Sequence, residues 1–231
     1  MVAPPRDYHH GDRLDRAGER VGEQLTLLEE LCEKHQLVSP YLSELVNPAS
    51  VDLRLGREFV NLSDRDIPYQ PIMVPDMHGT VWAKPGQRFE ADRVGLRPGV
   101  ALLATTLEKV VVPDRKISFI SDRRADQSIQ EWRDSWIEVP ALVADVKLKS
   151  SAARAGLDHA LAGWVDPGFQ GTLTLEFHAH RPVELVAGKC YVQLCVSTML
   201  AAPRKGYQQT GRYVGEHAQG AVLARDKKEE R

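Results

Sequence analysis

Residues 164–177 read WVDPGFQGTLTLEF, a turn sequence followed by an alternating strand sequence. The Asp-Pro-Gly at 166–168 suits a tight turn, because proline fixes φ and glycine tolerates positive φ. After Gly171, threonines and Glu176 alternate with leucines and Phe177, so one face of the predicted strand is polar and the other apolar. This pattern predicts a strand that borders a core on one side.

Seven further runs share this texture: they are short, rich in Val, Leu and Thr, and separated by Gly and Pro, which predicts strands and tight turns. They are VDLRLG (51–56), IMVP (72–75), GTVWAKPG (79–86), VALLATTLEKVVVP (100–113), ALVADVKL (141–148), PVELVAG (182–188) and CYVQLCVSTM (190–199). Regular helical patterns do not separate these runs. We therefore predict a mainly β fold, a compact barrel or jelly-roll-like sandwich, rather than a doubly wound α/β sheet.

Two segments break the β texture. The first predicts an amphipathic helix over about residues 16–35; its apolar positions at helical spacing are Val21, Leu25, Leu28 and Cys32. The second is the charged stretch 114–138, where Ile129, Trp132 and Trp136 lie at i, i+3 and i+7. This spacing predicts an inserted amphipathic helix whose tryptophans pack against the β body.

Composition limits the function classes. The 231 residues hold 30 Lys+Arg and 32 Asp+Glu, a formal charge of -2, which disfavours nucleic-acid or anionic-membrane binding. The three cysteines favour a reducing compartment, hence the cytoplasm. Neither a signal peptide nor a membrane span is expected, since long apolar runs are missing. We expect an extension at 1–36, one domain at 37–225 with the insertion 114–138, and a charged tail at 226–231.

Two stretches carry the chemistry that the residues alone suggest. Glu176 lies beside threonines in a strand, and a carboxylate that loses hydration there could exchange protons near neutral pH. It could equally be a rim glutamate paired with an arginine. The run KSSAAR at 149–154 sets two hydroxyls and Arg154 among small residues, which suits a phosphate or base edge and also an ordinary loop.

Other motifs are weaker. Asp52 and Arg54 share a strand face and are expected to pair with each other. The run GRYVGEHAQG at 211–220 could close over a ligand or be a frayed tail. His178 and His180 share a face but lack a third metal ligand in view, and no zinc-deaminase, phosphate-loop or nucleophile-elbow motif occurs in the sequence.

Four motifs in this order, NPASVDLRLG (47–56), LKSSAARAGL (148–157), AGWVDPGFQGTLTLE (162–176) and GRYVGEHAQG (211–220), resemble the dCTP deaminase family of the trimeric dUTPase-like superfamily. The resemblance covers roughly residues 37–225. It implies a distorted β-barrel of the dUTPase-like, β-clip type and a homotrimer with sites at subunit interfaces. It also implies Mg2+ carried by a nucleotide triphosphate, no zinc, and hydrolytic deamination at the pyrimidine C4.

The same resemblance assigns roles to residues. Glu176 would be the catalytic general base and acid, with Ser150 and Arg154 as its partners and the Ala162 carbonyl bonded to the water. Ser151 would contact phosphate, and Asp166 would lie on the hairpin that cradles sugar and base. The residues expected to bind the nucleotide are Lys149, Ser151, His159, Asp166, Gln193, Arg212, Tyr213 and Glu216.

Three positions depart from the family pattern. Leu161 replaces a threonine, Glu216 replaces a glutamine and places a negative charge near the terminal phosphate, and Lys149 replaces a frequent arginine. The expected function is deamination of dCTP or a modified dCTP, alone or onward to dUMP and diphosphate, since AGWVDPGF is closer to the bifunctional members. The alternatives are a dUTPase-like pyrophosphatase without deamination, and a trimeric nucleotide-binding regulator that has lost catalysis.

Overall fold

The structure, a computed structural model, describes residues 26–62, 72–76, 79–84, 86–120, 136–159, 163–211 and 214. Its helices are α1 (Leu27–His35), the 3-10 turn η1 (Ser43–Leu45), α3 (Ser150–Arg154) and α4 (Tyr207–Thr210). Its strands are β1 (Val38–Ser39), β2 (Val46–Asn47), β3 (Ser50–Asn61), β4 (Ile72–Asp76), β5 (Gly79–Ala83), β6 (Arg88–Glu90), β7 (Arg93–Leu96), β8 (Leu102–Val111), β9 (Ile117–Ile120), β10 (Trp136–Val139), β11 (Leu142–Leu148), β12 (Leu157–His159), β13 (Trp164–Val165), β14 (Gln170–Ala179), β15 (Val183–Val186) and β16 (Cys190–Thr198).

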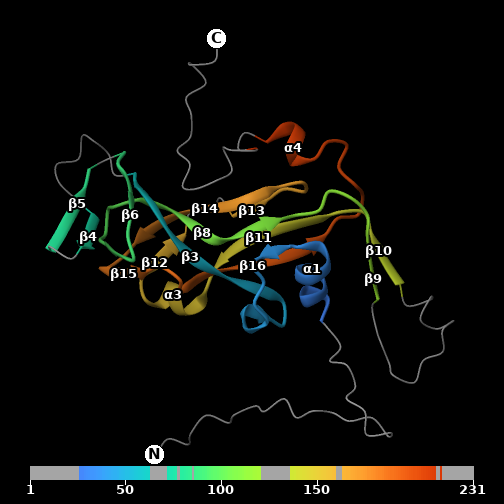
Figure 1. Cartoon of the computed structure of the whole chain (residues 1–231), viewed down its shortest axis with the longest axis horizontal. Helices are drawn as coiled ribbons and strands as arrows, with labels where there is room; N and C mark the ends of the chain where they lie inside the picture. Colours follow the sequence, from blue (N-terminus) through green and yellow to red (C-terminus); the bar gives the residue numbers. More distant parts are fainter. Residues whose placement is uncertain are drawn as a thin grey trace, which may run out of the picture.

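A ten-stranded sheet forms the body of the described chain. Its main path runs β12-β14-β8-β3-β16-β11-β13, with β1 paired to β8 and with β2 and β6 paired to β3. A four-stranded sheet, β15-β7-β4-β5, lies at one end of the molecule, and α1 lies toward the other (Figure 1). Each predicted run contains a strand, so the mainly β prediction is confirmed; the main sheet curls like half of a barrel.

Strand β14 has the alternation expected of it. Leu173, Leu175 and Phe177 are buried, whereas the threonines and Glu176 between them are exposed or half-buried. The main core forms where this apolar face meets neighbouring strands, with Phe59 of β3 and Phe177 both at 0% exposure. Burying such large side chains provides most of the stability of a sheet of this kind.

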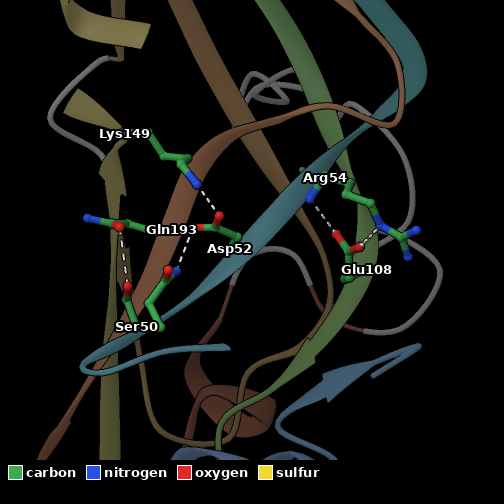
Figure 2. Close-up of polar contacts among 7 residues, drawn as sticks. Ser50, Asp52, Arg54, Glu108, Lys149 and Gln193 are labelled. Atoms are coloured by element: carbon green, nitrogen blue, oxygen red, sulfur yellow. Dashed lines mark hydrogen bonds and ion pairs between the residues drawn. The ribbon is translucent and has the colours of Figure 1, made fainter. Parts of the chain in front are cut away.

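The core face of β8 also contains a carboxylate. Glu108 is 0% exposed, on the same strand face as the buried Leu102 and Ala104. Its two oxygens accept from the backbone N–H of Arg54 at 2.8 Å and from the Arg54 Nε at 2.6 Å (Figure 2). Both oxygens of the buried charge are thus compensated, as burial of a carboxylate demands.

The expected pairing of Asp52 with Arg54 is therefore wrong. Arg54 reaches across to Glu108 on β8, while Asp52 pairs with Lys149, which directly follows β11 (Figure 2). Side chains two residues apart on one strand share a face, but a side chain from another strand can lie closer to either of them than they lie to each other.

Helix α1 is shorter than predicted. Thr26 has extended backbone dihedrals and forms a capping box with Glu29, so the helix starts at Leu27 rather than near residue 16. Leu31 and Cys32 are its buried side chains. Residues 16–25 lie outside the described part of the chain.

The helix predicted for residues 114–138 is wrong at both ends of that stretch. Strands β9 and β10 pair antiparallel there, with Trp136 opposite Ile120 and Val139 opposite Ile117. Both strands are rich in β-branched and aromatic residues, which favour a pleated strand over a helix. Ile129 and Trp132 lie outside the described residues.

Replacing Glu108 tests the buried pair. We expect Glu108→Gln to lower the free energy of unfolding by about 3 kcal/mol, because the Arg54 guanidinium loses its buried counter-charge. The matched control is Asp92→Asn, which breaks the Arg57–Asp92 pair between side chains 61% and 71% exposed, with an expected loss of under about 1 kcal/mol. Urea unfolding at one fixed protein concentration measures both, and equal small losses would contradict the role given to Glu108.

Candidate functional site

The Ser-Ser-x-x-Arg motif forms helix α3. Ala152 is its buried residue, while Ser150, Ser151 and Arg154 are exposed. Ser150 and Arg154 lie four residues apart, which places them on one face of the helix. The chain enters α3 from the sheet, since the N–H of Lys149 donates to the carbonyl oxygen of Tyr191 at 2.8 Å. The motif therefore presents two hydroxyls and a guanidinium to solvent from a short, anchored helix.

A polar cluster lies beside the start of α3 (Figure 2). The Lys149 ammonium pairs with Asp52, whose other carboxylate oxygen accepts from Asn47 Nδ2 at 2.9 Å. Gln193, directly opposite Asp52 in the β16–β3 register, accepts from Ser50 Oγ at 3.2 Å. The structure thus brings together Lys149 and Gln193, two residues expected to bind the nucleotide. In this chain the Lys149 charge is engaged by Asp52.

Glu176 lies on the polar face of β14 with a 39% exposed side chain. Its Oε1 is 3.5 Å from Nε2 of His178, two residues further along the same face. His159 of β12 lies opposite Phe177 in the strand register and packs edge-on against that ring, with centroids 5.8 Å apart. The accessible Glu176 carboxylate thus lies beside His178 on the polar face of β14, while His159 packs against Phe177 of the buried face.

Burial lowers the pKa of His159 below its ordinary 6.5, although the nearby carboxylates of Glu176, Asp158 and Asp145 oppose the shift. The His159 imidazole is therefore neutral at neutral pH. A neutral imidazole can both donate and accept a hydrogen bond, whereas its charged form only donates.

The turn between β13 and β14, which carries Asp166, is held from two sides. Its carboxylate Oδ1 accepts from the indole Nε1 of Trp164 at 3.0 Å, and the Trp164 side chain is 65% exposed. Helix α4 contacts the tip, since Tyr207 N–H donates to the Pro167 oxygen at 2.7 Å and Gln208 Nε2 to the Gly168 oxygen at 2.8 Å. Asp166 itself stays exposed at this fixed turn.

Gly163 explains why the Ala-Gly-Trp motif needs a glycine. A Cβ at this position would lie 2.4 Å from the carbonyl oxygen of Val146. The close approach allows the N–H of Val146 to donate to the Gly163 oxygen at 2.8 Å, which joins the motif to β11. Leu161 and Ala162, just before it, lie outside the described residues, as do Arg212, Tyr213 and Glu216.

The predicted residues thus fall into two groups. One surrounds α3 with Lys149, Ser150, Ser151, Arg154 and Gln193; the other lies along β12, β13 and β14 with His159, Asp166 and Glu176. In the described part of the chain, no hydrogen bond or ion pair connects Glu176 to α3. We call these two groups of residues half-sites.

Sequence reasoning missed several residues around these groups. The role of Glu108 could have been predicted, because a charged residue at an inward position of an apolar strand requires a buried partner. Asn47 and Ser50 precede VDLRLG within the first motif, but their bonds to Asp52 and Gln193 could not be predicted from it. Arg181, which contacts the end of α3, had no local signal.

Among the described residues, no group of three or more His, Cys, Asp or Glu side chains is placed to hold a metal ion. The same residues include no helix that is both long and apolar enough to cross a membrane.

The family model described as dCTP deaminase-like matches residues 23–125 and 134–199. The chain belongs to the dCTP deaminase-like family. The match includes α1 and passes over residues 126–133, within the charged stretch between β8 and β10.

Named relatives align with most of the length of the chain. The dCTP deaminase, dUMP-forming, of Persephonella marina is 31% identical over 194 residues, covering 82% of this chain and 89% of the relative. The protein of that name from Methanoculleus marisnigri is 33% identical over 195 residues, covering 83% and 87%. The crystal structure of 2'-deoxycytidine 5'-triphosphate deaminase from Agrobacterium tumefaciens is 17% identical with a TM-score of 0.47, covering 74% of this chain and 46% of that chain.

His159 makes stability depend on pH. Its lowered pKa means that the unfolded chain binds more protons than the folded chain between that pKa and 6.5, so stability falls as pH falls through this window. We expect His159→Gln to flatten the decline of the urea midpoint between about pH 7.5 and about pH 5. His180→Gln is the control, because that imidazole is 75% exposed. A His159→Gln profile parallel to that of the wild type would contradict the assignment.

Proposed function

We propose that this protein deaminates dCTP, or a closely related deoxycytidine triphosphate, by hydrolysis. Family membership across most of the chain supports this, and the observation that carries the proposal is the position of Glu176. Its accessible carboxylate lies on β14, the strand that follows the turn carrying Asp166, and its charge acts on the neutral imidazole of His159. One positioned carboxylate suffices for general acid–base chemistry at one carbon.

In this mechanism Glu176 accepts a proton from water as the oxygen bonds to C4 of the pyrimidine. The proton then passes from the Glu176 carboxyl to the exocyclic nitrogen, the C4–N bond breaks, and ammonia leaves with its electron pair. The remaining hydroxyl proton moves from the oxygen on C4 to N3, which gives the uracil carbonyl. The products are dUTP and ammonia, and Glu176 returns to its carboxylate form. Ser150, Arg154 and the Ala162 carbonyl orient the water and the tetrahedral intermediate.

Asp166 and the α3 residues would hold the rest of the nucleotide. Asp166, fixed by Trp164, would accept from the sugar hydroxyl, while Ser151 and Lys149 would contact phosphate. Arg212, Tyr213 and Glu216 would complete the phosphate end. We propose that Mg2+ enters bound to the triphosphate oxygens, since hard oxygen donors suit it and it commonly accompanies substrate phosphates.

We also propose onward hydrolysis of dUTP to dUMP and diphosphate. The support is that the two relatives above are named dUMP-forming and align with this chain over more than four fifths of its length. Release of diphosphate together with ammonia would separate this activity from deamination alone. Turnover of dUTP without turnover of dCTP would favour a pyrophosphatase, and binding without turnover a regulator.

The site would be assembled from two chains of a homotrimer. The support is that no hydrogen bond or ion pair joins Glu176 to α3 among the residues that the structure describes, so a neighbouring copy could supply the other half-site. The catalytic unit would be residues 37–225. The three cysteines are free, which fits a reducing compartment, and we propose a cytoplasmic enzyme.

Glu176→Gln tests the chemistry directly. Because glutamine cannot accept the proton from water, we expect dCTP deamination to fall by a factor of about 100 or more, while dCTP binding persists. The matched control is Glu184→Gln on β15, whose partner is the exposed Arg93 at 2.9 Å and whose activity should stay near wild type. Chromatography of uridine nucleotides with an ammonia assay measures both. Full activity of Glu176→Gln would refute the assigned role.

Mixing two inactive variants tests the shared site. Trimers assembled from Glu176→Gln and Arg154→Ala chains would contain interfaces where one chain supplies Glu176 and the other Arg154. Random assembly of equal amounts would restore about a quarter of wild-type activity. No restored activity in mixed trimers verified by native mass spectrometry would place both residues in one chain's site instead.

A further inference from the structure

Arg181 contacts the end of the helix that carries the Ser-Ser-x-x-Arg motif. It lies just beyond β14, and its Nε donates to the carbonyl oxygen of Ala155 at 2.9 Å. Its Nη2 donates to the carbonyl oxygen of Arg154. These residues are 26 and 27 positions apart in sequence, so the contact is a tertiary one.

Helix α3 depends on such contacts because it is short. A five-residue segment leaves most of its terminal N–H and carbonyl groups without helical partners, and a helix of this length is unstable in isolation. Its N-cap, Lys149, provides no side-chain hydrogen bond. The Arg181 guanidinium therefore supplies donors at the end where free carbonyls accumulate, and its positive charge suits that end.

Gly156 makes room for this contact. Its φ is +92°, and a Cβ there would lie 2.5 Å from Arg181 Cγ and 2.7 Å from Nε. The N–H of His180 also donates to the Gly156 oxygen at 2.8 Å. Two consecutive residues at the exit of β14 thus hold the exit of α3.

The guanidinium has no competing ionic partner in the described part of the chain. It donates to the two carbonyl oxygens, and no carboxylate among the residues that the structure describes forms an ion pair with it. A surface arginine that only paired with a carboxylate could be lost with little effect. An arginine that satisfies two main-chain carbonyls cannot be exchanged for an apolar residue so freely.

We propose that Arg181 is a positioning residue: by sealing the end of α3 it fixes the orientation of Ser150 and Arg154. Strand β14, which carries Glu176 in one half-site, then also sets the geometry of the motif in the other. The effect on reaction rate rests on the proposed deaminase function, whereas the effect on α3 does not.

Two substitutions separate the donors from the stem. Arg181→Met keeps an apolar stem over Gly156 but removes both hydrogen bonds, and Arg181→Lys retains a cationic donor. The matched control is Arg93→Met, because the Arg93 side chain on β7 is 57% exposed and pairs with Glu184 on the neighbouring strand β15. Amide hydrogen exchange reports the end of α3 through the N–H groups of Ala155 and Gly156, which bond to the oxygens of Ser151 and Ala153.

We expect exchange at Ala155 and Gly156 to quicken about tenfold or more in Arg181→Met, with kcat for dCTP falling roughly tenfold or more. Arg181→Lys should recover part of both losses, and Arg93→Met should match the wild type in both. Unchanged exchange in Arg181→Met would overturn the capping role, and faster exchange with an unchanged kcat would overturn the positioning role. A wild-type protein inactive on every deoxycytidine nucleotide would refute the proposed function, and exchange alone would then decide the capping contact.

Discussion

Strand β8 lies between β3 and β14, and the rest of the sheet extends outward from these three strands. Its fully buried Glu108 fixes the alignment with β3, because a carboxylate without water must remain on the donors of Arg54. On the other side, Thr106 Oγ1 accepts from the N–H of Leu173, close to where the β8–β14 register shifts. A slip of β8 by one residue would turn Glu108 outward and an outer-face residue inward. The half-sites on β14 and α3 therefore rest on the register of a strand that contributes no proposed contact to the nucleotide.

The sequence predicted the parts of the fold that depend on local pattern. The alternation after Gly171 correctly gave β14 its two faces, and the Asp-Pro-Gly run correctly predicted the turn between β13 and β14. The error at Trp136 arose because three apolar residues at helical spacing say little when the flanking sequence favours strands. The start of α1 was misplaced because the Thr26-x-x-Glu29 capping box was overlooked.

The candidate site was predictable where a motif is continuous and unpredictable where two distant segments meet. The motifs that contain Ser150 and Glu176 could be recognised in the sequence. The partners of Asp52 and Arg54 could not, since Lys149 and Glu108 reach them only after the sheet has formed. Arg181 belongs to the same class: nothing in its neighbouring residues reveals that it will meet Arg154. Local pattern thus identifies reactive groups, whereas the contacts that orient them are tertiary.

The contact between Arg181 and α3 also has a consequence for the order of events during protein synthesis. Arg154 leaves the ribosome 27 residues ahead of Arg181, which donates to its carbonyl oxygen. The α3 segment is therefore synthesised before the residue that caps it. Until β14 has paired with β8 and β12, the two serines of the Ser-Ser-x-x-Arg motif lie in a segment that has no C-terminal cap and is too short to be a stable helix alone. The motif thus acquires its final shape late, when the strand bearing the carboxylate has already been synthesised.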